Sequence, residues 1–202
     1  MPVTFAPPYD SPIETRFVEL YINHADDDVT LTPQHATPTL CGNFICDFLL
    51  ATPDGRRVGI ECDGREFHDP SRDEWRDAMI LGERHLDAIY RIRGTDINHR
   101  MEDVLYLLAS LEPQLFHNRA LANLEVMASE EVKKASEDVD QDFFHYRYRS
   151  GIDEGRFCVE RRSVDVPPGQ RRFWQAAYRY ADSIGGGQLD EVIARYRGDG
   201  IL

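Results

Sequence analysis

The stretch FICDFLLATPDGRRVGIECDGREFH, from Phe44 to His68, decides the fold that we expect for this chain. Two hydrophobic runs, Phe44–Leu50 and Arg57–Cys62, flank a short polar segment at Pro53–Gly55. In such a segment Pro presets φ, Asp bonds its own backbone and Gly accepts a positive φ. The pattern therefore predicts a β-hairpin made of two largely buried strands.

Each strand of this hairpin carries a carboxylate that apolar patterning does not predict. Asp47 interrupts the first run, and Glu61 and Asp63 close the second. Pairing around the turn would bring Asp47 close to Glu61, and His68 follows shortly after. Carboxylates with a nearby His form an oxygen-rich site of the kind that suits Mg²⁺ or Mn²⁺.

A structural interpretation of the same acids competes with the metal site. Asp47 could cap a turn, and Glu61 could pair with Arg57 or Arg93. An acid in a strand interior is costly when it is buried without a partner, so two aligned acids more often mark a site. We therefore favour the metal site.

The order of these residues resembles the PD-(D/E)xK nuclease superfamily, and it is most similar to the branch related to very-short-patch-repair endonucleases. The resemblance covers residues 11 to 112, and its motifs are short, so their order along the chain matters most. The segments that carry it are Ser11–Glu14 before a helix, Asp47 on one strand, Glu61–Gly64 and His68 after the next, Arg72–Asp77 at a second helix, and Ile89–Arg93 on a third strand.

The resemblance implies an α/β (α+β) fold in which a small mixed central sheet is flanked by helices. Residues 1–10 would form a flexible arm, 11–112 the restriction-endonuclease-like core, and 113–202 a C-terminal extension of helices with a candidate hairpin. The implied activity is metal-dependent hydrolysis of DNA phosphodiester bonds, in repair, restriction or phage defence. The implied cofactor is Mg²⁺ or Mn²⁺, and the implied partners are DNA and a protein of a repair or defence system.

Residue by residue, the resemblance assigns catalytic roles to Asp47, Glu61, Asp63 and His68. The metal would be held by Asp47, Glu61, the backbone carbonyl of Cys62 and Asp63. Substrate binding is assigned to three arginines of the following segment, Arg65, Arg72 and Arg76.

Asp63 stands where the family normally has a catalytic Lys. Three compensations are open: His68 could act as the general base, Arg72 or Arg76 could stabilise the phosphate, or a second metal could replace the Lys. Without any of them, the chain would be a catalytically inactive nuclease-fold module that acts in binding or complex assembly. A hydrolase acting on RNA or nucleotides is a weaker third hypothesis.

Glu14 has two interpretations. In the family, a carboxylate on this first helix can lie beside the metal site. The alternative, which we favour, is a capping box in which Ser11 is the N-cap, Pro12 the first helical residue and Glu14 the reciprocal partner.

Composition and charge limit the function classes. The chain has 202 residues, 42% of them hydrophobic, which is enough for a real core. Neither a long apolar run nor a signal-like N-terminus is present, so we expect no membrane association. Four cysteines without CxxC spacing indicate reduced thiols and a cytoplasmic location. The net charge of −13 argues against binding nucleic acid through electrostatic attraction over a large surface. Residues 143–180 are nevertheless basic, with eight Arg and four acidic residues.

The remaining chain is expected to form further strands and helices around this hairpin. A short edge strand is expected near 29–31, and helices are expected over 72–84, 101–111, 119–136, 170–181 and 189–196. The alternating segments 143–148 and 156–164 predict a second hairpin. Its aromatic and Arg residues could stack bases, although a half-buried strand with Arg at the solvent is the stronger interpretation.

Overall fold

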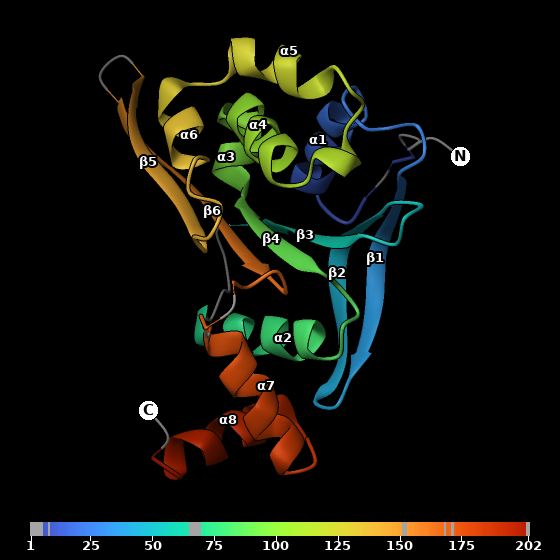
Figure 1. Ribbon diagram of the computed structural model, residues 1–202, viewed down its shortest axis with the longest axis vertical. Coiled ribbons are helices and arrows are strands. Elements are labelled where there is room, and N and C mark those ends of the chain that lie inside the picture. The colour runs from blue at the N-terminus through green and yellow to red at the C-terminus, as the bar shows by residue number, and fades with distance from the viewer. Residues whose placement is uncertain are drawn as a thin grey trace.

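A single mixed β-sheet runs through the middle of the molecule in the computed structural model (Figure 1). The structure describes residues 6–7, 9–64, 70–150, 153–167, 169–170 and 172–200. Its strands are β1 (Thr30–Thr39), β2 (Gly42–Ala51), β3 (Arg57–Asp63), β4 (Ala88–Arg93), β5 (Phe143–Ser150) and β6 (Asp153–Ser163). They lie in the order β1-β2-β3-β4-β6-β5, with β3 and β4 parallel and the other pairs antiparallel.

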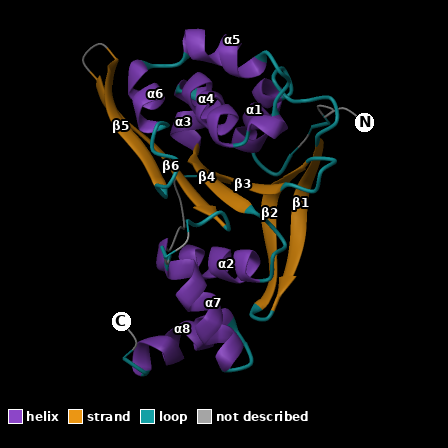
Figure 2. Ribbon diagram, in the orientation of Figure 1, coloured by secondary structure: helices purple, strands orange, loops and turns teal. Residues whose placement is uncertain are grey.

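Helices cover both faces of this sheet (Figure 2). One layer holds α1 (Pro12–Tyr21), α3 (Gly94–His99), α4 (Met101–Leu111), α5 (Ala120–Met127) and α6 (Glu130–Ala135), with a 3₁₀ turn at Pro113–Leu115. The opposite layer holds α2 (Pro70–Gly82), α7 (Phe173–Ser183) and α8 (Leu189–Gly198). The expected fold class, a small mixed sheet flanked by helices, is confirmed. No helix in the described ranges is long and apolar enough to cross a bilayer.

The hairpin that dominates the sequence forms as expected, between β2 and β3. Phe48 pairs with Ile60 and Ala51 with Arg57. In the turn Gly55 has φ +95°, which is the left-handed region that Gly tolerates. The strands thus place their carboxylates at the end of the hairpin remote from the turn.

Alternation along β3 sends its side chains to two separate cores. Val58 and Ile60 belong to the core under α1 and α4. Gly59 faces the other core, where an added Cβ would lie 2.7 Å from Leu86 Cδ1. By the same alternation Glu61 faces the α2 side of the sheet, and Asp63 follows it at the end of the strand.

Two predicted elements differ from the structure. The expected short strand near 29–31 is the ten-residue edge strand β1, whose polar sequence forms a strand because it pairs along the hydrophobic β2. The single helix expected over 119–136 is two helices, because Ser129 caps α6 while its own N–H bonds Asp103 at 2.7 Å. Capping by Ser at this point starts a new helix in a new direction.

The predicted C-terminal hairpin is present as β5 and β6. It joins the central sheet through β6, which pairs antiparallel with β4. Phe144 and Tyr146 are buried under the helical layer, whereas Arg147 and Arg149 face the solvent. The half-buried-strand interpretation therefore describes this segment, and these two aromatic side chains are not free to stack on bases. The predicted arm, 1–10, lies mostly outside the described residues, although the Tyr9 ring packs edge-on against Phe48 at 5.4 Å.

Candidate functional site

Asp47 lies at an irregular point of β2. Cys46 belongs to the α2-side core and Phe48 to the opposite core, which strict alternation along a strand would not allow. The residue opposite Asp47 on β1 is Gln34, whose φ of 48° is unusual outside Gly. An irregularity of this kind re-aims a side chain, and here it directs Asp47 toward β3.

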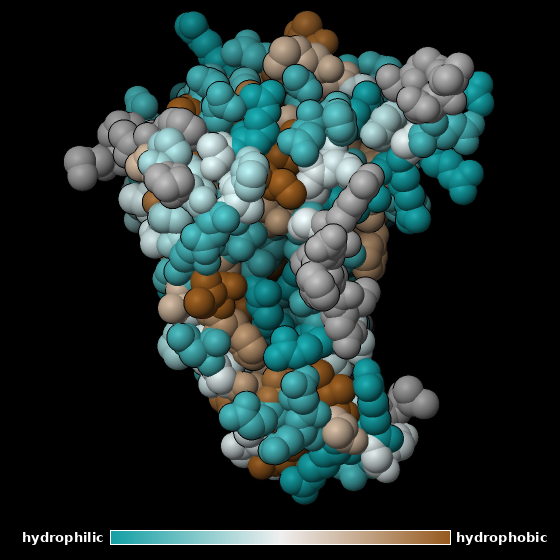
Figure 3. All heavy atoms as spheres, turned by 180° about the vertical axis from the view of Figure 1, so that it is seen from behind, coloured by the Kyte–Doolittle hydropathy of each residue, from teal (hydrophilic) through white to brown (hydrophobic). Residues whose placement is uncertain are grey.

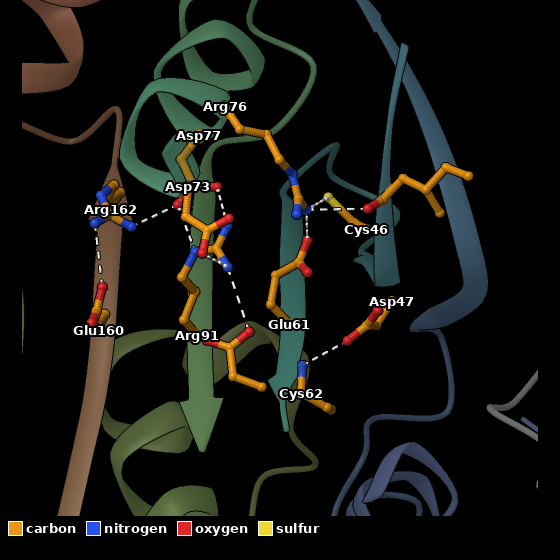
Figure 4. A network of polar contacts seen from close by, with 12 residues as sticks. Cys46, Asp47, Glu61, Cys62, Asp73, Arg76, Asp77, Arg91, Glu160 and Arg162 are labelled. Atoms are coloured by element: carbon orange, nitrogen blue, oxygen red, sulfur yellow. Dashed lines mark hydrogen bonds and ion pairs between the residues drawn. The ribbon is translucent and has the colours of Figure 1, made fainter. Parts of the chain in front are cut away.

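Asp47 meets the strand that carries the second carboxylate. Its Oδ2 accepts a 2.7 Å hydrogen bond from the backbone N–H of Cys62, the residue between Glu61 and Asp63. Figure 4 shows Asp47 and Glu61 on neighbouring strands at the same end of the hairpin. The sequence-based expectation that pairing would bring these two acids close is therefore met.

Glu61 has a partner that the sequence analysis did not foresee. The guanidinium of Arg76, on α2, donates from Nη2 to Glu61 Oε1 and also to the carbonyl of Ile45, at 3.1 Å (Figure 4). The ion pair is nearly dry, since only 6% of the Glu61 side chain is exposed. The structural alternative named Arg57 or Arg93 as partner of Glu61, and both were wrong.

Burial dominates the electrostatics of this corner. It raises the pKa of Glu61 to about 7, because the favourable charges of Arg76 and Arg91 only partly offset the desolvation. Burial likewise raises the pKa of Asp47, although the Cys62 N–H and Arg76 act in the opposite direction. The surrounding cations therefore do not fully compensate either carboxylate.

Arg91, in the middle of β4, organises the acids next to this pair. It holds Asp77 of α2 by two bonds, Nε to Oδ2 at 2.9 Å and Nη2 to Oδ1 at 2.8 Å. The third guanidinium nitrogen, Nη1, lies 3.5 Å from Asp63 and 3.7 Å from Asp73. Arg162 of β6 adds a 2.6 Å bond to Asp77. Asp63 is thus drawn toward Arg91.

The arginines protect the charge of Asp77. Burial alone would raise the pKa of this carboxyl, but Arg91 and Arg162 outweigh the desolvation and hold it below the ordinary value. The signals that could have revealed this network are the arginine inside the apolar run at Ile89–Ile92 and the helical spacing of Asp73 and Asp77. Neither signal names a partner on its own.

The other predicted site residues are distributed as follows. Arg72 donates to Asp190 of α8 at 3.0 Å, so it lies where α2 meets α8. Glu14 acts as a cap: its N–H donates to Ser11 Oγ at 3.2 Å, and its Oε2 accepts from Asp10 N at 3.3 Å. It also lies near the candidate site, since burial raises the pKa of Glu14 and the charge of Asp47 adds to this shift. Arg65 and His68 lie outside the described residues.

A cleft of about 580 Å³ opens where the parallel strands β3 and β4 end. Crevices at the carboxyl ends of parallel strands are common ligand sites in α/β folds. The back of the molecule is hollowed at mid-height, and the residues around the hollow are mostly hydrophilic (Figure 3). The cleft is lined by Ile13, Asp63, Gly64, Arg93, Gly94, Thr95, Asn98 and His99.

The donors at this corner suit a hard divalent cation in chemistry, being two carboxylates, Asp47 and Glu61, and the backbone carbonyl of Cys62. Their geometry does not yet form a metal centre. Within the described ranges, no three Asp, Glu, His or Cys side chains converge into a group able to hold a metal ion. Because Arg76 occupies Glu61 Oε1, a cation bound through that oxygen would have to displace Arg76.

Comparisons of the chain with known protein families, with curated proteins and with solved structures find no match. The resemblance to PD-(D/E)xK nucleases therefore rests on the chain's own residues, and the activity that follows from it is a proposal.

Proposed function

We propose that this chain is a metal-dependent endonuclease that hydrolyses DNA phosphodiester bonds at the end of the β2–β3 hairpin. The supporting observation is the bond from Cys62 N to Asp47 Oδ2, which fixes one carboxylate beside the strand that carries Glu61. A buried acid, Glu61, beside a half-buried one, Asp47, is costly for stability alone, and such clusters are typical of functional sites.

The chain's own residues divide the work as follows. Asp47, Glu61 and the Cys62 carbonyl would hold Mg²⁺ or Mn²⁺, while Asp63 stays with Arg91. When bound, such a cation supplies Lewis-acid stabilisation of a phosphoryl oxygen and activation of water. Arg76, released from Glu61, carries a guanidinium whose planar donors match a phosphate. His68 keeps its proposed role as general base.

The ion pair between Arg76 and Glu61 favours a second function, a nuclease-fold module that binds without cutting. In this alternative Arg76 stays paired with Glu61. Its guanidinium then neutralises the carboxylate that a metal cation would otherwise neutralise. The module would assemble with DNA and a protein partner in a repair or defence complex. Either function goes with a cytoplasmic location, and the four cysteines are free thiols.

Cleavage assays separate the two functions. Plasmid and oligonucleotide DNA are incubated in Mg²⁺ and in Mn²⁺ with wild type, Glu61→Gln and His68→Ala. The matched control is Glu19→Gln, which makes the same change at a half-exposed glutamate of α1. We expect cleavage by wild type and the control, loss of cleavage by Glu61→Gln and a strong reduction by His68→Ala.

Cleavage that survives Glu61→Gln would mean that the active site lies elsewhere. No cleavage of DNA by wild type in either metal would leave the binding module as the function. An RNA substrate run in parallel detects the weaker third hypothesis, a ribonuclease.

A further inference from the structure

Exposed arginines gather on the outward face of the β5–β6 hairpin, in a protein whose net charge is −13. Strand alternation places Phe144 and Tyr146 of β5 in the core and leaves the opposite face uncovered. On that face His145, Arg147 and Arg149 are all exposed. The hairpin extends beside α6 and away from α2, so no helix of the second layer lies over its far end (Figure 1).

Two arginines on this face are direct cross-strand partners. Arg147 of β5 pairs with Arg156 of β6, and both side chains are exposed. Like charges directly opposite each other destabilise a sheet, and here no ion pair with another described residue relieves them. An anion placed between the two guanidinium groups would turn this repulsion into attraction.

The acids of the same face are already engaged. Glu154 pairs with Arg149 at 2.7 Å, and Glu160 pairs with Arg162 at 3.2 Å. The charges of these two acids are therefore neutralised within the face, whereas no acid among the described side chains pairs with Arg147 or Arg156.

Sheet register connects these arginines to the candidate site. Asp63 of β3 pairs with Arg93 of β4, and the β4–β6 register places Cys158 next to Arg93. Cys158 in turn pairs with His145 of β5. Three strand spacings of about 4.8 Å separate Asp63 from His145, roughly 14 Å in all, which corresponds to about four base pairs of B-DNA.

Arg93 lies where the face meets the cleft. It lines the cleft together with Asp63. Its Nε bonds Asp96 at 2.8 Å, while its Nη2 is buried without a hydrogen-bond partner among the described residues. A basic strip, defined as Arg93, Arg147 and Arg156, thus leads from the open hairpin face into the cleft beside the carboxylates.

We propose that this basic strip is the docking surface for the phosphate backbone of duplex DNA, and that it directs the bound strand to the acids at the end of β3. The proposal rests on the proposed function for its choice of DNA. Charge complementarity supports it: the chain has a net charge of −13, whereas Arg147 and Arg156 place two positive charges side by side with no acid paired to either in the described part of the chain. Tyr146 and Phe144 supply the rigid inner face of the strand and take no part in binding.

The test measures the affinity for a fluorescein-labelled 20-base-pair duplex by anisotropy, in the Glu61→Gln background so that the probe stays intact. The variant is Arg147→Glu with Arg156→Glu. The matched control is Arg179→Glu with Arg195→Glu, the same charge change at two exposed arginines of α7 and α8. Thermal unfolding confirms that both double variants are folded.

We expect the strip variant to weaken binding about tenfold or more at 100 mM salt and to lower the salt slope by about two, with little change in the control. Equal weakening in both double variants would show a general charge effect and overturn the strip. An affinity unchanged in the strip variant, or no binding of the duplex at all, would also overturn it.

The outcomes separate this inference from the proposed function. Cleavage is compared with Arg147→Glu and Arg156→Glu placed in the wild-type background. A cleavage rate equal to that of wild type would contradict the docking surface and leave the proposed endonuclease intact. If duplex binding depends on Arg147 and Arg156 but the wild-type protein does not cleave DNA, the proposed endonuclease activity is contradicted. The docking surface is then supported.

Discussion

Arg91 and Asp77 form a two-point ion pair between β4 and α2, with Nε–Oδ2 and Nη2–Oδ1 distances of 2.9 and 2.8 Å. Asp77 is completely buried, and Arg162 donates to it from β6. A single carboxylate thus fixes α2 against two strands of the sheet. Because α2 also carries Arg76, the pair determines where the guanidinium of Arg76 lies relative to Glu61.

Asp77→Asn is the first prediction. Removing this charge leaves Arg91 with only its longer contacts to Asp63 and Asp73, and Arg162 with only Glu160. We therefore expect a loss of about 3–5 kcal/mol in the free energy of unfolding. Chemical denaturation of the variant at pH 7 measures it. The control is Asp190→Asn, which removes an exposed partner of Arg72 and is expected to cost less than about 0.5 kcal/mol.

The contribution of Asp77 to the free energy of unfolding also depends on pH, and its pKa gives the direction. The folded pKa of Asp77 lies below the ordinary value of 3.8, so its contribution to stability is present above that pH. It is lost as the pH falls through the folded pKa. Asp77→Asn should therefore flatten the acid limb of the stability curve below pH 3.8, and an unchanged acid limb would contradict the ion-pair account.

Arg76→Met is the second prediction. Freed from the guanidinium, Glu61 becomes available to a cation, so we expect Mn²⁺ to bind more tightly than in wild type, by calorimetric titration. The same variant should cleave DNA more slowly, because the donor for the substrate phosphate is gone. Asp47→Asn is the counterpart and should weaken Mn²⁺ binding.

A misfolded variant would lose both properties. Tighter Mn²⁺ binding together with slower cleavage in Arg76→Met would therefore not be a result of misfolding. If neither wild type nor Arg76→Met binds Mn²⁺, the metal-dependent mechanism is wrong and the binding module stands. The thermal midpoint of each variant serves as the folding control.

His24 gives the third prediction, a loss of stability in mildly acidic solution. Burial, and then the charge of His117 stacked 6.4 Å away, lower the pKa of His24 below 6.5. A group with a lowered folded pKa is protonated first in the unfolded chain, so stability is full above pH 6.5 and falls as the pH drops toward the folded pKa. His24→Gln should reduce this fall in urea titrations between pH 7 and 5. His99→Gln, at an exposed histidine, should leave it intact.

Gly82→Ala is the fourth prediction and concerns the contact of α2 with α7. An added Cβ would overlap the ring of Tyr178, so the ring must move. Overpacking of this kind costs about 1–3 kcal/mol. Gly198→Ala, in α8, meets no atom within 4 Å and is the control that should be neutral. A thermal midpoint of Gly82→Ala equal to that of the control would show that α7 is not packed as described.

The sequence by itself determined the elements whose cause is local. The turn chemistry of Pro53–Gly55 and the hydrophobic runs beside it set the β2–β3 hairpin, and this register brings Asp47 close to Glu61. Helix α4 has the bounds 101–111 that its apolar stripe predicts. Ser11 caps α1 as its spacing to Glu14 indicates, because a cap is decided within four residues.

Only the tertiary structure decided which charges meet. Arg76 pairs with Glu61, and Arg91 pairs with Asp77, across elements whose packing depends on the whole sheet. Similarly, β1 is a strand because β2 supplies its hydrogen bonds. The sequence also left open that β6 pairs with β4. Local propensity acts over a few residues, whereas an ion pair between distant segments is selected by burial, since a charge that loses its water must find a partner wherever the fold provides one.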